Sequence, residues 1–430
     1  MSWYKADLAG LIAVLQSGSR PKGGASVDTG EVMSLGGENI LQQGGVDLRD
    51  VKQVPQAFYE AMTKGHLQDR DVLINKDGAN TGKVGLFRDP DDGSACINEH
   101  LFLLRGTTAK ITQEYLYYTL LSEHGQTIIR NRISGSAQPG LKSGFINNFP
   151  INLPESTDEQ GKISDILGSL DTAIEQTETI IAKQQRIKTG LMQDLLTKGI
   201  DEDGNIRSEA THAFKDSPLG RIPVEWDVRS CGELCTAIVV GIVVRPTQYY
   251  KDSGVPVLRS ANVREDQVTT VGLVFMSEDD NRALRKSQVR KGDLITVRTG
   301  YPGTTAVVPQ ELDGANCVDI VILRPEAEKI RSNYLAMWIN SDFGKKQVLE
   351  GQGGLAQQHF NVGQMRKLLV KTPPTKEQEQ IEYMLLAHRE NEGCLYKELK
   401  KLERKKVGLM RDLLTGERRV TALLAQAAPQ

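Results

Sequence analysis

Two kinds of loop combine glycine turns with polar or cationic side chains, an arrangement that proteins use to hold phosphate groups. Residues 18–24 (GSRPKGG) place Arg20 and Lys22 between glycines, where backbone N–H groups and positive side chains can bind a phosphate together. Residues 80–83 (NTGK) and 298–305 (RTGYPGTT) lie at equivalent places in the two halves of the chain and can reach phosphates or base edges. The alternative is that these loops are strand connections that contain glycine for backbone reasons alone.

Amide side chains after glycine-rich turns add a second kind of candidate, because Gln and Asn can bind adenine through two hydrogen bonds. Gln138 and residues 357–359 (QQH) have this setting. The sequence therefore predicts a DNA-binding surface that includes Arg20, Lys22, Asn80, Lys83, Gln138, Arg259, Asn262, Arg298, Tyr301, Gln357, Gln358 and His359.

Motifs of catalysis are missing from the sequence. It contains neither a phosphate-binding G-x-x-x-x-G-K-[ST] loop nor an H-E-x-x-H zinc motif, and its six histidines lie far apart. Cys231 and Cys235 have no second pair at a metal-binding spacing, so we expect inert thiols there. We predict a protein that binds without doing chemistry, with no catalytic or metal-binding residue and no cofactor of its own.

The composition limits the classes of partner. The chain has 430 residues and a formal net charge of −2, which excludes a strongly basic coat but leaves room for a local basic surface. Neither a secretory signal nor an apolar run long enough for a membrane span is visible, so no membrane partner is expected. Five scattered cysteines predict a reducing cytoplasmic location rather than a disulfide framework.

The chain repeats itself with a period of roughly 220 residues, which is too long for a solenoid repeat. Residues 190–197 (GLMQDLLT) return as residues 408–415 (GLMRDLLT), and residues 157–163 (TDEQGKI) return as residues 375–381 (TKEQEQI). The segments between these motifs match only weakly. We interpret this pattern as one role shared by both connectors and two different roles for the two domains.

The elements that must position the loops follow from hydrophobic spacing. Apolar residues recur on alternating steps of four and three over 157–197 and 375–415, which predicts two long helices that pair in a coiled coil. Short apolar runs between glycine-rich turns predict strands at 72–74, 83–87, 100–104, 294–297, 306–308 and 320–323, and one helix per domain at 114–129 and 333–349.

The predicted fold class is α+β, with two similar globular domains separated by two long antiparallel helices and related by a pseudo-twofold repeat. We expect a first domain at 1–155, a central helical connector at 156–200, a linker at 201–222, a second domain at 223–372, a C-terminal helical connector at 373–416 and a frayed tail at 417–430.

The order of these motifs resembles the specificity subunit of type I restriction–modification enzymes. Residues 219–226 (LGRIPVEW) resemble the family's opening of a domain, followed by the Glu-Gln helix start and the GLMxDLLT helix end, and the last two occur twice. The likeness spans nearly the whole chain. One departure is that the first half lacks the Leu-Gly-x-Ile-Pro opening and begins abruptly at Trp3.

The resemblance implies a non-catalytic subunit that serves defence against foreign DNA. Each globular target recognition domain would bind one half of a bipartite asymmetric site in double-stranded DNA, while the helices set the spacing and dock methyltransferase subunits, two in number. Motor-nuclease subunits would join through the complex, and S-adenosylmethionine, ATP and Mg²⁺ would belong to the partners. The docking residues would be Ile163, Leu167, Leu170, Ile174, Leu191, Leu195, Ile381, Leu385, Leu399, Leu402, Leu409 and Leu413.

A competing hypothesis is a scaffold without DNA, in which two ligand-binding domains sit on a helical rod. DNA binding would distinguish the two, because the affinity of a DNA-binding protein must fall steeply with salt.

Overall fold

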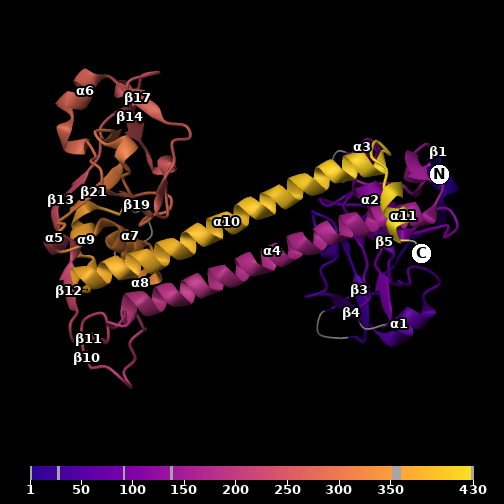
Figure 1. The fold of residues 1–430 in the computed structure, drawn as a ribbon, viewed down its shortest axis with the longest axis horizontal. Helices are drawn as coiled ribbons and strands as arrows, with labels where there is room; N and C mark the ends of the chain where they lie inside the picture. The colour runs from indigo at the N-terminus through magenta and orange to yellow at the C-terminus, as the bar shows by residue number, and fades with distance from the viewer. Residues whose placement is uncertain (1, 27–29, 91–92, 136–138, 351–359, 428–430) are drawn as a thin grey trace. The chain divides into compact units, whose positions relative to one another are not determined.

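The computed structural model describes residues 2–26, 30–90, 93–135, 139–350 and 360–427. They form two compact units (Figure 1): unit 1 consists of residues 1–179 and 396–430, and unit 2 of residues 180–395. Two long helices, α4 (Thr157–Thr197) and α10 (Thr375–Leu414), contribute one half to each unit. The sequence predicted both helices to within one residue at each end.

Unit 1 is built on a four-stranded antiparallel sheet with the order β2-β8-β5-β6. A three-stranded sheet, β4-β3-β7, contains the parallel pair β3 and β7, and β1 pairs with β9 just before α4. The elements are β1 (Trp3–Asp7), β2 (Ile12–Ser17), β3 (Val32–Leu35), β4 (Lys52–Val54), α1 (Gln56–Ala61), β5 (Val72–Asn75), β6 (Val84–Leu86), β7 (Ala95–Ile97), β8 (Leu101–Gly106), α2 (Gln113–Leu121), α3 (Glu123–Arg130) and β9 (Pro150–Pro154).

Unit 2 repeats this topology strand for strand. Its sheets have the orders β13-β21-β18-β19, β17-β14-β20 and β12-β22, with β14 and β20 parallel, and two small hairpins are added. The elements are β10 (Phe214–Lys215), β11 (Ile222–Pro223), β12 (Asp227–Ser230), α5 (Cys231–Leu234), β13 (Cys235–Val240), β14 (Val255–Leu258), β15 (Val263–Arg264), β16 (Gln267–Val268), β17 (Val274–Met276), α6 (Glu278–Ala283), β18 (Leu294–Val297), β19 (Thr305–Val307), β20 (Asn316–Cys317), β21 (Ile320–Pro325), α7 (Ser332–Asn340), α8 (Asp342–Glu350), α9 (Val362–Lys367) and β22 (Leu369–Thr372).

The single helix expected in each domain is wrong, because both helices are broken in the middle. Ser122 separates α2 from α3, and Ser341 separates α7 from α8. Each serine hydroxyl accepts a hydrogen bond from a glycine N–H three residues later and so begins the second helix. A Cβ on Gly125 or Gly344 would lie 2.2 or 2.4 Å from a carbonyl oxygen of the first helix, which explains why these glycines recur.

The glutamate of the repeated Glu-Gln motif binds an indole and a guanidinium in both units. Glu377 accepts hydrogen bonds from Trp226 Nε1 at 3.0 Å and from Arg207 Nη1 at 2.5 Å. Glu159 accepts them from Trp3 Nε1 at 3.4 Å and from Arg419, whose Nε and Nη2 lie at 2.7 and 2.8 Å. We name these sets the unit 2 clamp (Trp226, Glu377, Arg207) and the unit 1 clamp (Trp3, Glu159, Arg419).

The glutamine of the motif holds the loop that precedes the domain helix. Gln160 accepts a hydrogen bond from the N–H of Thr112 and donates to two carbonyls, and Gln378 does the same for the N–H of Arg331. Both glutamines are completely buried. An unpartnered buried amide would be costly, so these bonds make the Glu-Gln pair a requirement of the fold.

Each clamp joins the first turn of one long helix to the chain that follows the end of the other. Arg207 lies beyond α4 and binds the start of α10, whereas Arg419 lies beyond α10 and binds the start of α4. Within each unit the two helix halves therefore run antiparallel. Lys406 pairs with Asp171 at 2.5 Å in unit 1, and Lys188 pairs with Glu392 at 3.7 Å in unit 2.

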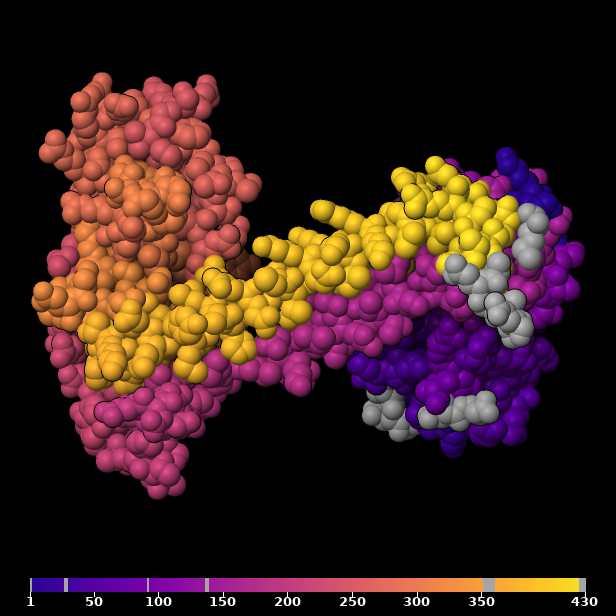
Figure 2. All heavy atoms as spheres, in the orientation of Figure 1, coloured from indigo at the N-terminus to yellow at the C-terminus, as the bar shows by residue number. Residues whose placement is uncertain are grey.

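Two segments expected to be loose are tied to the fold. In the predicted linker, Ile222 is buried, and Arg207 makes the unit 2 clamp. In the predicted tail, Val420 is buried and residues Thr421–Ala427 form the short helix α11. On the face of unit 1 drawn in Figure 2, α11 and the end of α10 lie at the surface. Val420 therefore ties the start of this segment to the core of unit 1.

Candidate nucleic-acid interface

The four-stranded sheet of unit 1 brings several predicted loops to one edge. In its antiparallel order, β2 and β5 end where β6 and β8 begin, so residues 18–24, 76–83 and 98–100 leave from the same side. We name this set the unit 1 edge. In unit 2, residues 241–245, 298–304 and 318–319 form the corresponding unit 2 edge.

Cations of the unit 1 edge are exposed or partly exposed. Arg20 is exposed and its Nε lies 2.7 Å from a carboxylate oxygen of Glu99, and Lys22 is exposed nearby in the chain. Lys76 donates from Nζ to the Ser17 hydroxyl at 3.1 Å. These cations can bind phosphate or donate hydrogen bonds to base edges.

The turn after β5 supplies the remaining candidates of unit 1. Asn80 and Lys83 are half-buried, and Asn80 donates from Nδ2 to the Gly37 carbonyl at 3.5 Å. Gln138 lies outside the described residues. The chain just after it returns to this edge, because the N–H of Gly78 donates to the Pro139 carbonyl at 3.1 Å.

Arg298 is at the predicted edge of unit 2, but its guanidinium is already used. Its side chain is 16% exposed, Nη1 lies 2.6 Å from Asp319 Oδ1, and Nε donates to the Phe360 carbonyl at 3.1 Å. The prediction of a direct phosphate contact by Arg298 therefore does not fit its position. Tyr301, on the same turn, is 84% exposed.

Two further candidates of unit 2 have structural roles. Asn262 is completely buried; it accepts from the N–H of Arg259 and donates to the carbonyls of Thr269 and Val271. Asn262 therefore holds this loop together, and a direct base contact by it stays a prediction. Arg259 is half-buried and donates from Nη2 to the Gly272 carbonyl at 2.6 Å. The remaining candidates of this half, Gln357, Gln358 and His359, lie outside the described residues.

Some residues of the two edges were not predicted from the sequence. In unit 1 they include Lys76 and His100, whose Nδ1 lies 2.5 Å from Asp77 Oδ1. In unit 2 they include the exposed residues Val243, Val244 and Arg245. Internal alignment of the loops that follow β2 and β13 would have pointed to the second group.

Most predicted docking residues on the long helices are buried within the chain. Ile163, Leu167 and Leu413 belong to the core of unit 1, and Leu195 and Ile381 belong to that of unit 2. The other members of the set that are buried or packed against these cores are Leu170, Leu191, Leu385 and Leu409. These side chains pack within the chain, so little of their surface is open to a partner, and docking through them stays a prediction.

The helix surfaces that remain open carry other apolar side chains. Ile174, Leu399 and Leu402 of the predicted set are partly exposed. Tyr383 is 75% exposed and Val407 is 62% exposed, and neither belonged to the predicted seam. The further exposed apolar residues of α4 and α10 are Ile180, Ile187 and Tyr396.

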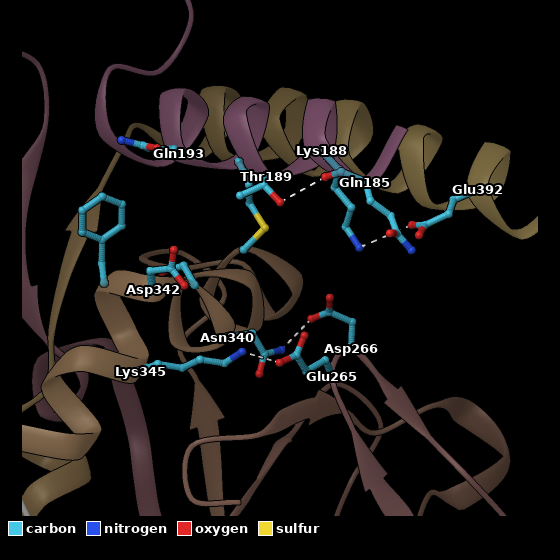
Figure 3. Close-up of a pocket in the computed structure, with 13 residues that line it drawn as sticks. Gln185, Lys188, Thr189, Gln193, Glu265, Asp266, Asn340, Asp342, Lys345 and Glu392 are labelled. Carbon is cyan, nitrogen blue, oxygen red and sulfur yellow. Dashed lines mark hydrogen bonds and ion pairs between the residues drawn. The ribbon is translucent and has the colours of Figure 1, made fainter. Parts of the chain in front are cut away.

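A cleft of about 530 Å³ lies within unit 2, between the long-helix halves and the turn from β15 to β16 (Figure 3). Several of its polar groups pair with one another: Asn340 donates a hydrogen bond to Asp266 at 2.7 Å, and Lys345 pairs with Glu265. Burial raises the pKa of Asp266, although the hydrogen bond from Asn340 opposes this rise. These internal pairs make the cleft a joint between elements of unit 2.

The described residues contain no group of three or more His, Cys, Asp or Glu side chains that could hold a metal ion. Among the helices described, none is long and apolar enough to cross a membrane.

Comparison with known proteins gives a consistent result. Residues 14–184 match the family described as Type I restriction modification DNA specificity domain. The Type I restriction enzyme MjaVIII specificity subunit of Methanocaldococcus jannaschii is 23% identical over 83% of this chain and 81% of its own. The putative type I restriction enzyme MjaX specificity subunit of the same organism is 25% identical over 97% of this chain and 94% of its own.

Solved structures show the same fold over nearly the whole chain. The S subunit of a type I restriction–modification system from M. genitalium superposes with a TM-score of 0.59 at 14% identity and covers 96% of both chains. A chain from a study of complex assembly in the type I R-M system also has a TM-score of 0.59, at 16% identity, covering 97% of this chain and 98% of that one. Residues 14–184 thus match a type I restriction–modification DNA specificity domain, and the chain as a whole is similar in sequence and fold to the specificity subunits of these systems.

Proposed function

We propose that each unit binds one half of a bipartite, asymmetric site in double-stranded DNA through its edge. The observation that carries this proposal is the contrast between frame and edge. The sheet order and the Trp–Glu–Arg clamp occur twice, whereas the exposed edge loops differ in their residues. Because a shared frame with two different edges suits two different sequences, an asymmetric site is expected.

The long helices set the distance between the two half-sites and dock two methyltransferase subunits in this proposal. The exposed apolar side chains on α4 and α10 are available for such contacts. Motor-nuclease subunits join through the complex. The chain is a non-catalytic subunit, so S-adenosylmethionine, ATP and Mg²⁺ belong to the partners, and we place the complex in the cytoplasm.

An exchange of residues 223–372 with those of a relative tests the assignment of half-sites. The donor must carry tryptophan at the position of Trp226, because this indole belongs to the unit 2 clamp. Methylation mapping of host DNA is expected to show a change in one half of the recognised site and an unchanged second half. Changes in both halves would contradict the proposal.

A further inference from the structure

The first loop of each edge occupies the same place in the two units. A Cβ on Gly18 would lie 1.7 Å from the Ile97 carbonyl oxygen, and one on Gly241 would lie 2.5 Å from that of Cys317. The partner strands agree, because Ile97 pairs with Leu35 of β3 as Cys317 pairs with Leu258 of β14. Counting onward from the two glycines, residues 20–22 correspond to residues 243–245.

The chemistry of this loop differs between the units. Unit 1 has Arg-Pro-Lys at residues 20–22, whereas unit 2 has Val-Val-Arg at residues 243–245. Val243 is 51% exposed and Val244 is 71% exposed, so neither side chain contributes much to a core. We name Val243, Val244 and the exposed Tyr301 the apolar tip.

The apolar tip stands on a rigid base. Ile242 donates its N–H to the Cys317 carbonyl and accepts at its own carbonyl from the N–H of Asp319, at 2.9 and 3.1 Å. The carboxylate of Asp319 binds Arg298, which is the first residue of the loop 298–304 that contains Tyr301. The two loops are anchored on strands β13 and β18, which flank β21 and therefore lie about 10 Å apart.

The side chains of the tip select a chemical partner. Valine has no hydrogen-bonding group, and its short, stiff side chain suits contact with the 5-methyl group of thymine in the major groove. Side chains that wedge between base steps are typically longer, such as Phe, Leu or Met. Arg245, next in the chain, is exposed and is held at a left-handed backbone angle of φ 42°, beside the tip and available to a phosphate.

We propose that the apolar tip recognises thymine methyl groups in the half-site bound by unit 2. This inference rests on the proposed function, because it needs the unit 2 edge to face DNA. The corresponding loop of unit 1 carries Arg20 and Lys22 and binds through charge and hydrogen bonds instead.

Deoxyuridine in place of thymine tests the inference, because it removes only the methyl group. The full chain with its methyltransferase subunits is titrated with duplexes of the mapped target, with one thymine replaced at a time in either half-site. At one or two positions of the unit 2 half, affinity is expected to fall about fourfold per methyl group, corresponding to ~0.8 kcal/mol.

Two variants identify the side chains responsible. The double variant Val243→Ser/Val244→Ser is expected to bind the thymine and deoxyuridine duplexes equally. The matched control, Val224→Ser, changes an exposed valine of unit 2 in the segment before β12 and is expected to keep the fourfold preference. Unchanged binding of nonspecific DNA by each variant shows that it is folded.

Several outcomes would overturn the inference. These are a unit 2 half-site without thymine, equal binding of both duplexes by the unaltered chain, or a thymine preference that survives in the double variant. Loss of DNA bending in that variant, without a thymine preference in the parent, would indicate a wedge and also overturn it. If exchange of residues 223–372 still changes one half-site in such a case, the proposed function stands and only the apolar tip fails.

Discussion

Replacement of Glu377 by glutamine is expected to destabilise unit 2 strongly. Glu377 accepts four hydrogen bonds: from the N–H of Ile200 at 2.9 Å, from Trp226 Nε1 at 3.0 Å, and from Arg207 Nη1 and Nη2 at 2.5 and 3.3 Å. The side chains of Glu377 and Arg207 are only 8% and 12% exposed. In Glu377→Gln an amide NH₂ group faces these donors, and the buried guanidinium loses its counter-charge.

The size of the effect follows from this burial. Removing one partner of a buried ion pair costs about 3–5 kcal/mol, and we expect the lower end because glutamine keeps one acceptor oxygen. Glu159→Gln in unit 1 is expected to cost about 1–3 kcal/mol, because Arg419 is 33% exposed and can be rehydrated. The control Glu390→Gln, on the exposed face of α10, should stay within about 0.5 kcal/mol.

Urea unfolding followed by tryptophan fluorescence measures these free energies, and amide exchange of Ile200 reports the clamp directly. Because the cost comes from an uncompensated charge, the added variant Arg207→Leu is expected to restore part of the stability lost in Glu377→Gln. Two results would refute the reasoning: a loss of stability in Glu377→Gln no larger than that in Glu390→Gln, or fully additive effects of Glu377→Gln and Arg207→Leu.

Four further outcomes can be measured. Gly199→Ala should lower the free energy of unfolding by about 1–2 kcal/mol or more, because φ at this residue is 64° and the new Cβ would lie 2.1 Å from the Glu377 carboxylate. Gly190→Ala, inside α4, should raise the free energy of unfolding by about 1 kcal/mol. Urea unfolding of both variants measures these changes. Burial raises the pKa of Glu159, but the hydrogen bonds from Arg419 and Trp3 outweigh this effect and hold the pKa below 4.5. The difference in stability between the parent and Glu159→Gln should therefore be complete above pH 4.5 and should vanish as the pH falls through the lowered pKa, which urea unfolding over a pH series measures. Arg20→Ala should weaken binding of all sequences alike and reduce the salt slope of the DNA affinity by about one; an unchanged slope would remove Arg20 from the phosphate contacts. Matched four-residue insertions in both α4 and α10 lengthen each helix by about 6 Å and should widen the gap between mapped half-sites by one or two base pairs, whereas insertion in α4 alone should impair assembly.

The elements of the frame could be predicted from sequence because their signals are periodic or repeated. The bounds of α4 and α10 followed from hydrophobic spacing, and the duplicated topology followed from motifs that return in order. The break between α2 and α3 was missed because its serine carries no strong local signal. It depends on the close approach of Gly125 to a carbonyl of the preceding helix, which is a contact and not a pattern.

The clamps show which contacts the internal repeat could not predict. The repeat identified Glu159 and Glu377 as equivalent, but it could not identify their arginine partners. Arg207 follows Gly199 by eight residues, whereas Arg419 follows Gly416 by three. The same contact is therefore made from different positions, and only the folded chain brings these residues together.

The candidate interface was predictable by region rather than by residue. Arg20 and Arg298 look alike in sequence, since both are cations beside glycine turns, yet Arg20 is exposed and Arg298 is bound between a carboxylate and a carbonyl. The same limit applies to the seam of the helices. A heptad of leucines is expected both for a core within the chain and for a surface that binds a partner.

The clamps also explain why the two long helices are nearly equal in length, 41 and 40 residues. Each helix begins at one clamp and runs into the other, and within each unit it is paired with its counterpart. A change in the length of one helix alone would therefore break a clamp or its pairing, so selection can act on spacing only through both helices together. The edge loops carry less of this constraint, because several of their side chains, such as those of Arg20, Val244 and Tyr301, are exposed and the sheets hold the ends of the loops. The sheets and the clamp are kept in both units, whereas the edge loops can differ. New half-sites can therefore arise without loss of the fold.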